Sequence, residues 1–221
     1  MKSLLFDYGG TLDADGSTWI DRFYPLYREA GHDFPRSAFD RAFYDSEDNL
    51  PARHSLNGLD LEQTLHLQVQ DVLKVLAPEQ LASAGPIAAR FTADSRLHFA
   101  KLRPVLERLR GRYLLGVVSN FYGNLEDVLR AEGLRDLFTV VADSGALGVT
   151  KPEPGIFLHA AKAMNSSPEE CVMIGDSIAR DMAGATGVGM KKALLAAGAS
   201  VPNGGQDWTI RSVLELEALL P

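Results

Sequence analysis

Three residues that can do chemistry on a phosphate group, Asp7, Ser119 and Asp176, each end a short apolar run. Lys151 follows a fourth run after a loop. The carboxyl ends of parallel strands form the edge of an open sheet where ligands bind. There, two carboxylates could hold a hard cation such as Mg²⁺, and a hydroxyl and an ammonium could hold phosphate oxygens. Because an aspartate can also attack phosphorus, this set predicts a phosphoryl-transfer site.

The turn after Asp7 contains Gly9, Gly10 and Thr11, so the chain must bend sharply where the carboxylate lies. Thr11 and the nearby backbone N–H groups could bind an anion. Taken alone, Asp7 fits a turn-capping aspartate equally well. Its functional interpretation therefore depends on the other three strand ends.

Strands and helices alternate over most of the chain, which predicts an α/β fold with a doubly wound parallel sheet. Helix-forming segments, including one that begins at Pro154, separate the apolar runs. We expect strands at 1–7, 113–118, 138–142, 171–174, 192–196 and 207–210, and helices at 104–110, 124–132, 178–186 and 211–220.

Residues 20–100 have a different pattern, with apolar side chains at helical spacing and several Gly and Pro breakers. This pattern predicts an all-α helical bundle inserted after the first strand, as a cap over the active edge of the sheet. We expect a Rossmann-like core of residues 1–13 plus 100–221, a cap of residues 14–99, and hinges at 14–18 and 95–103.

Composition excludes several classes of protein. The net charge is −7 with no basic stripe, which disfavours nucleic-acid binding. No apolar run has the length of a membrane span, and an acid at position 7 comes too early for a signal peptide. With Cys171 as the one cysteine, no internal disulfide forms, so we expect a buried thiol and a cytoplasmic protein. The sequence does not indicate an oligomeric state.

Four motifs in order make the chain resemble the haloacid dehalogenase superfamily of hydrolases, in its phosphatase-like branch with an inserted α-helical cap. The first is Asp7, Gly10, Thr11 and Leu12, and the second is Ser119 and Asn120. The third is Ser144, Gly148, Lys151, Pro152, Pro154, Ile156 and Phe157, and the fourth is Gly175, Asp176, Ser177, Asp181, Gly184 and Ala185.

The resemblance implies a Mg²⁺-dependent hydrolase that acts on a small phosphorylated metabolite through an aspartyl-phosphate. It makes Asp7 the nucleophile, Asp176 the second carboxylate ligand of the metal, and Asp181 a support for the lysine or the metal. The backbone carbonyl of Gly9 would be a further metal ligand. Phosphate would be bound by Thr11, Ser119, Asn120 and Lys151.

Gly9 departs from the family pattern, because phosphatases of this family carry an aspartate there as general acid/base. Loss of such a group costs about 10²- to 10⁴-fold in rate. We therefore expect a bias toward acyl and aryl phosphates, with a burst and slow turnover. Other groups could fill the gap: Asp13, Asp15, His32, His54, His66 and His98.

Two alternatives stay open. A catalytically silent protein of this fold would bind phosphate or a partner without reaction. Phosphonatase-type C–P cleavage requires a cap lysine, and Lys74 is the lysine between residues 14 and 100. In the cap, Arg22, Arg41 and Arg53 could bind a substrate anion, and Trp19 could face the site.

Overall fold

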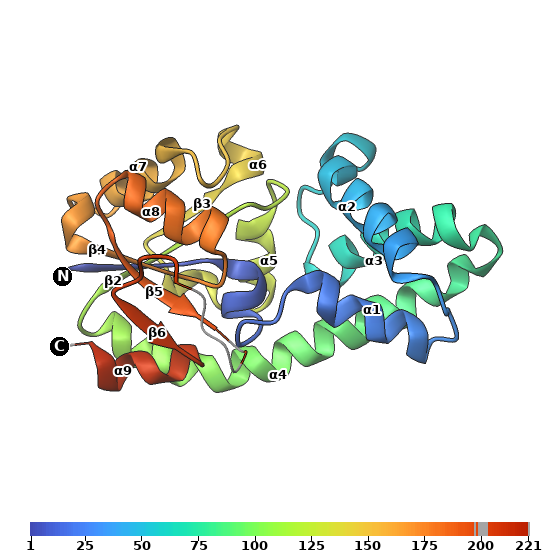
Figure 1. The fold of residues 1–221 in the computed structure, drawn as a ribbon, viewed down its shortest axis with the longest axis horizontal. Helices are drawn as coiled ribbons and strands as arrows, with labels where there is room; N and C mark the ends of the chain where they lie inside the picture. Colours follow the sequence, from blue (N-terminus) through green and yellow to red (C-terminus); the bar gives the residue numbers. More distant parts are fainter. Residues whose placement is uncertain (197, 199–202, 221) are drawn as a thin grey trace.

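The computed structural model describes residues 1–196, 198 and 203–220. Figure 1 shows two parts: a sheet covered by helices, which holds both ends of the described chain, and a set of helices beside it. The helical insertion, defined as α1 to α4, leaves the sheet after β1 and returns to it through α4. Together these features confirm the predicted α/β fold with an inserted helical unit.

The sheet has six parallel strands in the order β3-β2-β1-β4-β5-β6. Phe6 of the central strand β1 lies beside Val117 of β2 and Ile174 of β4. This register brings the residues after β1, β2 and β4 to one edge. The strands are β1 (Ser3–Phe6), β2 (Leu114–Ser119), β3 (Val140–Asp143), β4 (Cys171–Gly175), β5 (Lys191–Leu195) and β6 (Trp208–Ile210).

Helices cover both faces of the sheet. Alternate residues of each strand point to opposite faces, so Leu4 and Phe6 join one buried cluster and Leu5 joins another. The second cluster includes Ile156 and Phe157 of α7. The helices of this part are α5 (Leu125–Ala131), α6 (Ser144–Leu147), α7 (Pro154–Ala163), α8 (Ala183–Gly187) and α9 (Leu216–Leu219).

The helical insertion consists of α1 (Trp19–Glu29), α2 (Arg36–Arg53), α3 (Leu61–Leu76) and α4 (Ala84–Arg110). Asp60 begins α3 with a capping box, in which its side chain and that of Gln63 each accept from the other's backbone N–H. Aromatic side chains fill the interior of the insertion; Phe23 of α1 stacks on Phe91 of α4 with ring centroids 4.1 Å apart.

The prediction of a separate helix at 104–110 is wrong, because α4 is continuous from Ala84 to Arg110. The segment 95–103, where we expect a hinge, lies within this helix. Pro104 removes one backbone donor but does not end the helix. The apolar spacing of Phe99, Leu102 and Leu106 continues across it and keeps these side chains buried. A helix therefore forms the second connection between insertion and sheet (Figure 1).

The remaining predicted elements lie close to their expected positions. The predicted helix at 178–186 is divided into the helical turn Ile178–Met182 and α8, and that at 211–220 into the turn Val213–Glu215 and α9. Cys171 is buried and free, as expected. Within the described residues, no helix is both long enough and apolar enough to cross a bilayer.

Candidate functional site

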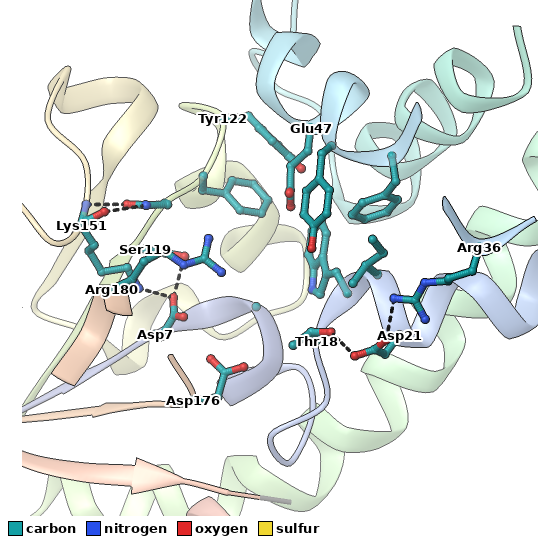
Figure 2. Close-up of a pocket in the computed structure, with 17 residues that line it drawn as sticks. Asp7, Thr18, Asp21, Arg36, Glu47, Ser119, Tyr122, Lys151, Asp176 and Arg180 are labelled. Atoms are coloured by element: carbon teal, nitrogen blue, oxygen red, sulfur yellow. Dashed lines mark hydrogen bonds and ion pairs between the residues drawn. The ribbon is translucent and has the colours of Figure 1, made fainter. Parts of the chain in front are cut away.

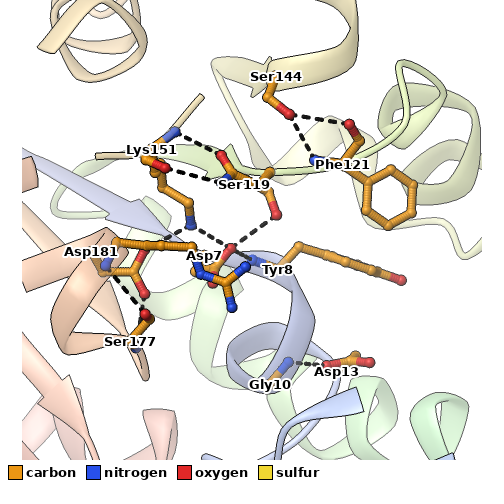
Figure 3. A network of polar contacts seen from close by, with 12 residues as sticks. Asp7, Tyr8, Gly10, Asp13, Ser119, Phe121, Ser144, Lys151, Ser177 and Asp181 are labelled. Atoms are coloured by element: carbon orange, nitrogen blue, oxygen red, sulfur yellow. Dashed lines mark hydrogen bonds and ion pairs between the residues drawn. The ribbon is translucent and has the colours of Figure 1, made fainter. Parts of the chain in front are cut away.

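Asp7 lies immediately after β1 at the sheet edge, where its carboxylate is surrounded by donors (Figure 3). Its Oδ1 accepts from the backbone N–H of Tyr8 at 2.7 Å and from the Ser119 hydroxyl at 2.9 Å. The same oxygen is 2.7 Å from the Lys151 ammonium. Because Asp7 is only 8% exposed, these contacts hold its carboxylate in one orientation at the cavity floor.

Lys151 is a buried cation held between two carboxylates. Its Nζ is 2.7 Å from Asp7 Oδ1 and 2.7 Å from Asp181 Oδ1. Burial lowers the pKa of Lys151, but the attraction of Asp181 and Asp7 outweighs it, so the pKa is raised above its ordinary value. Lys151 therefore stays positively charged and offsets the negative charge of the Asp7 and Asp181 carboxylates.

Asp181 is fully buried behind the lysine, where its Oδ2 accepts from the backbone N–H of Ser177 at 3.0 Å. A Cβ on Gly175 would lie 2.3 Å from Asp181 Oδ2, so a side chain at Gly175 would displace Asp181. Burial and Asp7 raise the pKa of Asp181 to about 6, although Lys151 opposes the shift. Asp181 thus contacts the Lys151 ammonium from the side away from the cavity, and its supporting role stays a prediction.

Asn120 joins the end of β2 to the lysine loop. Its Oδ1 accepts from the backbone N–H of Lys151 at 2.7 Å, and its Nδ2 donates to the Lys151 carbonyl at 3.1 Å. The side chain predicted to bind phosphate is therefore used by these two bonds. Asn120 acts on the site by fixing the backbone from which Lys151 extends.

The residues fit a hard divalent cation. Carboxylate oxygens of Asp7, Asp176 and Asp181 lie within 4.8 Å of one another. Burial, with repulsion from Asp7 and Asp181, raises the pKa of Asp176 to about 7. Lys151 opposes the repulsive part of this shift but does not cancel it. An oxygen-rich cluster with excess negative charge is the environment that Mg²⁺ prefers.

Gly10 is needed for this cluster. It has φ +81°, which favours glycine, and a Cβ there would lie 2.6 Å from Asp176 Oδ2. The turn after Asp7 can therefore pass directly beside the second carboxylate.

A cavity of about 290 Å³ opens above these carboxylates, between the sheet edge and the helical insertion (Figure 2). Its floor includes Asp7, Ser119, Lys151 and Asp176. The other lining residues are Gly9, Thr18, Trp19, Ile20, Asp21, Arg36, Phe43, Tyr44, Glu47, Asn120, Phe121, Tyr122 and Arg180.

Trp19 lines the cavity, as expected, and its indole covers Gly9. A Cβ on Gly9 would lie 3.2 Å from the indole Nε1. That Nε1 donates to Asp13 Oδ2 at 2.7 Å. Asp13 also accepts from the Gly10 backbone N–H and pairs with Arg22 at 2.5 Å. With three donors and no place in the cavity lining, Asp13 does not replace the acid absent at position 9.

Several other predicted residues lie outside this cavity. The Thr11 hydroxyl is buried without a partner among the described residues, and Thr11 does not line the cavity. None of the four candidate histidines lines the cavity, nor does Asp15. Lys74 is exposed and pairs with Asp71 on the insertion's surface, which disfavours a Schiff-base role.

The expected substrate arginines, Arg22, Arg41 and Arg53, do not line the cavity either. Arg36, Glu47 and Arg180 line it instead, and the sequence interpretation missed them. Glu47 stands in the run Asp45-Ser46-Glu47-Asp48, which is typical of a solvated helix face. Arg180 directly precedes Asp181 of the fourth motif, and this adjacency was the available signal.

The family model for haloacid dehalogenase-like hydrolases matches residues 1–189. The chain belongs to the haloacid dehalogenase-like hydrolases. Within this family, it is 35% identical over 165 residues to haloacid dehalogenase-like hydrolase domain-containing protein 3 of Bos taurus, covering 72% of this chain and 66% of the relative. It is also 40% identical over 114 residues to a glyceraldehyde 3-phosphate phosphatase of Pyrococcus furiosus, a match that covers 48% of this chain and 47% of that relative.

A solved structure supports the same membership. The crystal structure of a HAD phosphatase from Thermococcus onnurineus has a TM-score of 0.58 and 25% identity, and the match covers 100% of this chain and 98% of that chain. The match includes the helical insertion as well as the sheet. This haloacid dehalogenase-like hydrolase therefore shares the full two-part architecture with a phosphatase.

Proposed function

We propose that this chain is a Mg²⁺-dependent phosphatase that hydrolyses a small phosphorylated metabolite through an aspartyl-phosphate on Asp7. In this proposal residues 14–99 act as the cap over a core of residues 1–13 and 100–221. The single buried cysteine favours action in a reducing cytoplasm.

The observation that carries the proposal is the arrangement at Asp7. Oδ1 is engaged by Ser119 and Lys151 at the cavity floor. With substrate present, the Ser119 hydroxyl and the Lys151 ammonium can turn to the phosphoryl oxygens, where they neutralise charge that develops in the transition state. Asp7 then has a free lone pair for attack on phosphorus.

Asp7, Asp176 and the Gly9 carbonyl would hold Mg²⁺. When bound, the ion would supply positive charge to the phosphoryl oxygens and orient them toward the nucleophile. Asp181 keeps Lys151 in place without facing the substrate, since it is fully buried behind it.

A cavity of about 290 Å³ favours a substrate of metabolite size. Relatives of this chain are named for glyceraldehyde 3-phosphate, pyrimidine 5'-nucleotides and phosphoserine. Their names support a small organic phosphate as the substrate class.

The test is Mg²⁺-dependent phosphate release from acyl, aryl and alkyl phosphates by the wild-type protein and Asp7→Asn. We expect release that requires Mg²⁺ and disappears in Asp7→Asn. Release that survives in Asp7→Asn, or no release from any of the three classes, would contradict the proposal.

A further inference from the structure

Gly9 has no side chain that could act as the general acid/base, and the residue that covers it does not supply one either. The Trp19 indole covers Gly9, and its N–H is bound to Asp13. An indole N–H is a donor with no acceptor capacity, so it cannot take a proton from water. Proton transfer at the leaving oxygen must therefore come from another group that lines the cavity.

The carboxyls that line the cavity are Asp7, Asp21, Glu47 and Asp176. Asp7 and Asp176 belong to the nucleophile and metal site. Asp21 accepts from the Thr18 hydroxyl at 2.8 Å and pairs with Arg36 at 2.9 Å, and Thr18 lowers its pKa. Glu47 alone remains uncommitted in this set, because it makes no hydrogen bond or ion pair with any residue that the structure describes.

Glu47 extends from α2 into the space above Asp7, beside Tyr122 (Figure 2). Its side chain is half-buried. Burial raises the pKa of Glu47; Arg180 opposes this shift and the neighbouring Asp48 adds to it. Burial also raises the pKa of the Tyr122 phenol well above its ordinary value, so Tyr122 keeps its proton. A carboxyl with a raised pKa can both give and take a proton near neutral pH.

We propose that Glu47 of the helical insertion is the general acid/base of this enzyme, in place of the side chain missing at Gly9. This inference rests on the proposed phosphatase function. It also revises the expected bias toward activated phosphates, because a working acid at Glu47 allows alkyl phosphates to react.

The proposed reaction has two steps, formation and hydrolysis of the aspartyl-phosphate. Asp7 attacks phosphorus, the bond from phosphorus to the leaving oxygen breaks, and that oxygen takes the proton of the Glu47 carboxyl. The Glu47 carboxylate then takes a proton from water, whose oxygen attacks the phosphorus of phospho-Asp7. The Asp7–phosphorus bond breaks, inorganic phosphate leaves, and Asp7 and Glu47 return to their starting states.

The experiment compares wild type with Glu47→Gln on p-nitrophenyl phosphate and glycerol 1-phosphate, by steady-state and stopped-flow kinetics. Nitrophenolate leaves without a proton, so the first turnover of Glu47→Gln should be as fast as in wild type. Later turnovers should be slow, because water lacks its base, and a burst should therefore appear in the variant. On glycerol 1-phosphate we expect kcat to fall by about 10²-fold or more.

Controls separate this role from others. Asp45→Asn, on the same helix but paired with Arg53 outside the cavity, should keep wild-type kinetics. Glu47→Asp should retain part of the activity, and Glu47→Gln should flatten the limb of the pH–rate profile that reports the base.

Four outcomes would overturn the inference. A change in KM with kcat intact would make Glu47 a binding residue, and an equal loss of the first and the later turnovers would make its role structural. Unchanged kinetics on both substrates, with Asp7 still required, would leave the phosphatase function standing and remove Glu47 from it. Absence of any wild-type activity would instead contradict the phosphatase function, and the role of Glu47 with it.

Discussion

Replacing Lys151 by methionine removes the cation that two buried carboxylates share, while a side chain of similar length is retained. Lys151 is 4% exposed, and its Nζ contacts Asp7 and Asp181 at 2.7 Å each. Loss of one partner of a buried ion pair leaves an uncompensated charge and costs about 3–5 kcal/mol. At roughly 2–4 °C per kcal/mol for a chain of this size, Tm should fall by about 6–20 °C.

The size of this loss should depend on pH. The pKa of Asp181 is about 6 and that of Asp176 about 7, both raised above the unfolded value. A carboxyl whose pKa is raised by folding does not lower the stability at a pH where it is protonated in both the folded and the unfolded state. Its destabilising effect grows as pH rises from the unfolded pKa to the folded pKa. Lys151→Met raises these folded values further, so its destabilisation should be larger at pH 8 than at pH 5.

The assay is thermal unfolding of wild type, Lys151→Met and the exposed control Lys162→Met at both pH values, without Mg²⁺. The control should stay within 2 °C of wild type, a difference of about 0.5–1 kcal/mol. A Tm for Lys151→Met equally close to wild type at pH 8, or a loss larger at pH 5, would refute this reasoning.

Three further predictions concern the same site and the loops that support it. Mg²⁺ at about 100 times its Kd should stabilise the protein by about 2.7 kcal/mol. The increase in Tm should be larger at pH 8 than at pH 5, because protonated Asp176 cannot bind the ion, and Asp176→Asn should remove it. Gly9→Asp should move the Trp19 indole, whose Nε1 is 3.2 Å from the new Cβ; in a Trp208→Phe background, an unchanged indole emission would contradict this. Gly145→Ala should lower the free energy of unfolding by about 1–3 kcal/mol, because its Cβ would lie 2.5 Å from the backbone of Gly123 and Tyr122. The control Gly187→Ala, with open space at its Cβ, should not lower Tm.

The sequence was sufficient for the parts of the site that lie at strand ends. Asp7, Ser119 and Asp176 follow apolar runs, and parallel pairing brings such ends together regardless of side-chain detail. The same reasoning predicted the order of strands and helices, because period and breakers are local signals. It also predicted Lys151, whose loop is held by Asn120.

Apart from Trp19, the residues that reach the cavity from the helical insertion could not be predicted in this way. Which side of α2 faces the sheet depends on how the insertion packs, and Glu47 differs from its acidic neighbours only through that packing. The sequence also does not show which way the turn Tyr8–Leu12 directs the hydroxyl of Thr11, which does not line the cavity. The continuity of α4 through Pro104 depends on buried contacts of Phe99 and Leu106 that sequence pattern alone does not weigh against a proline.

The position of β1 in the sheet has a consequence for the order of folding. β1 pairs with β2, more than 100 residues later, and with β4, more than 160 residues later. Contacts so distant in sequence form slowly, whereas the helix pairs of the insertion are local. We therefore expect pulse-labelled hydrogen exchange to protect α3 and α4 before β1. Asp7 is then synthesised long before the strands that complete its surroundings and is among the last residues to acquire its neighbours, so partly folded chains carry no assembled site.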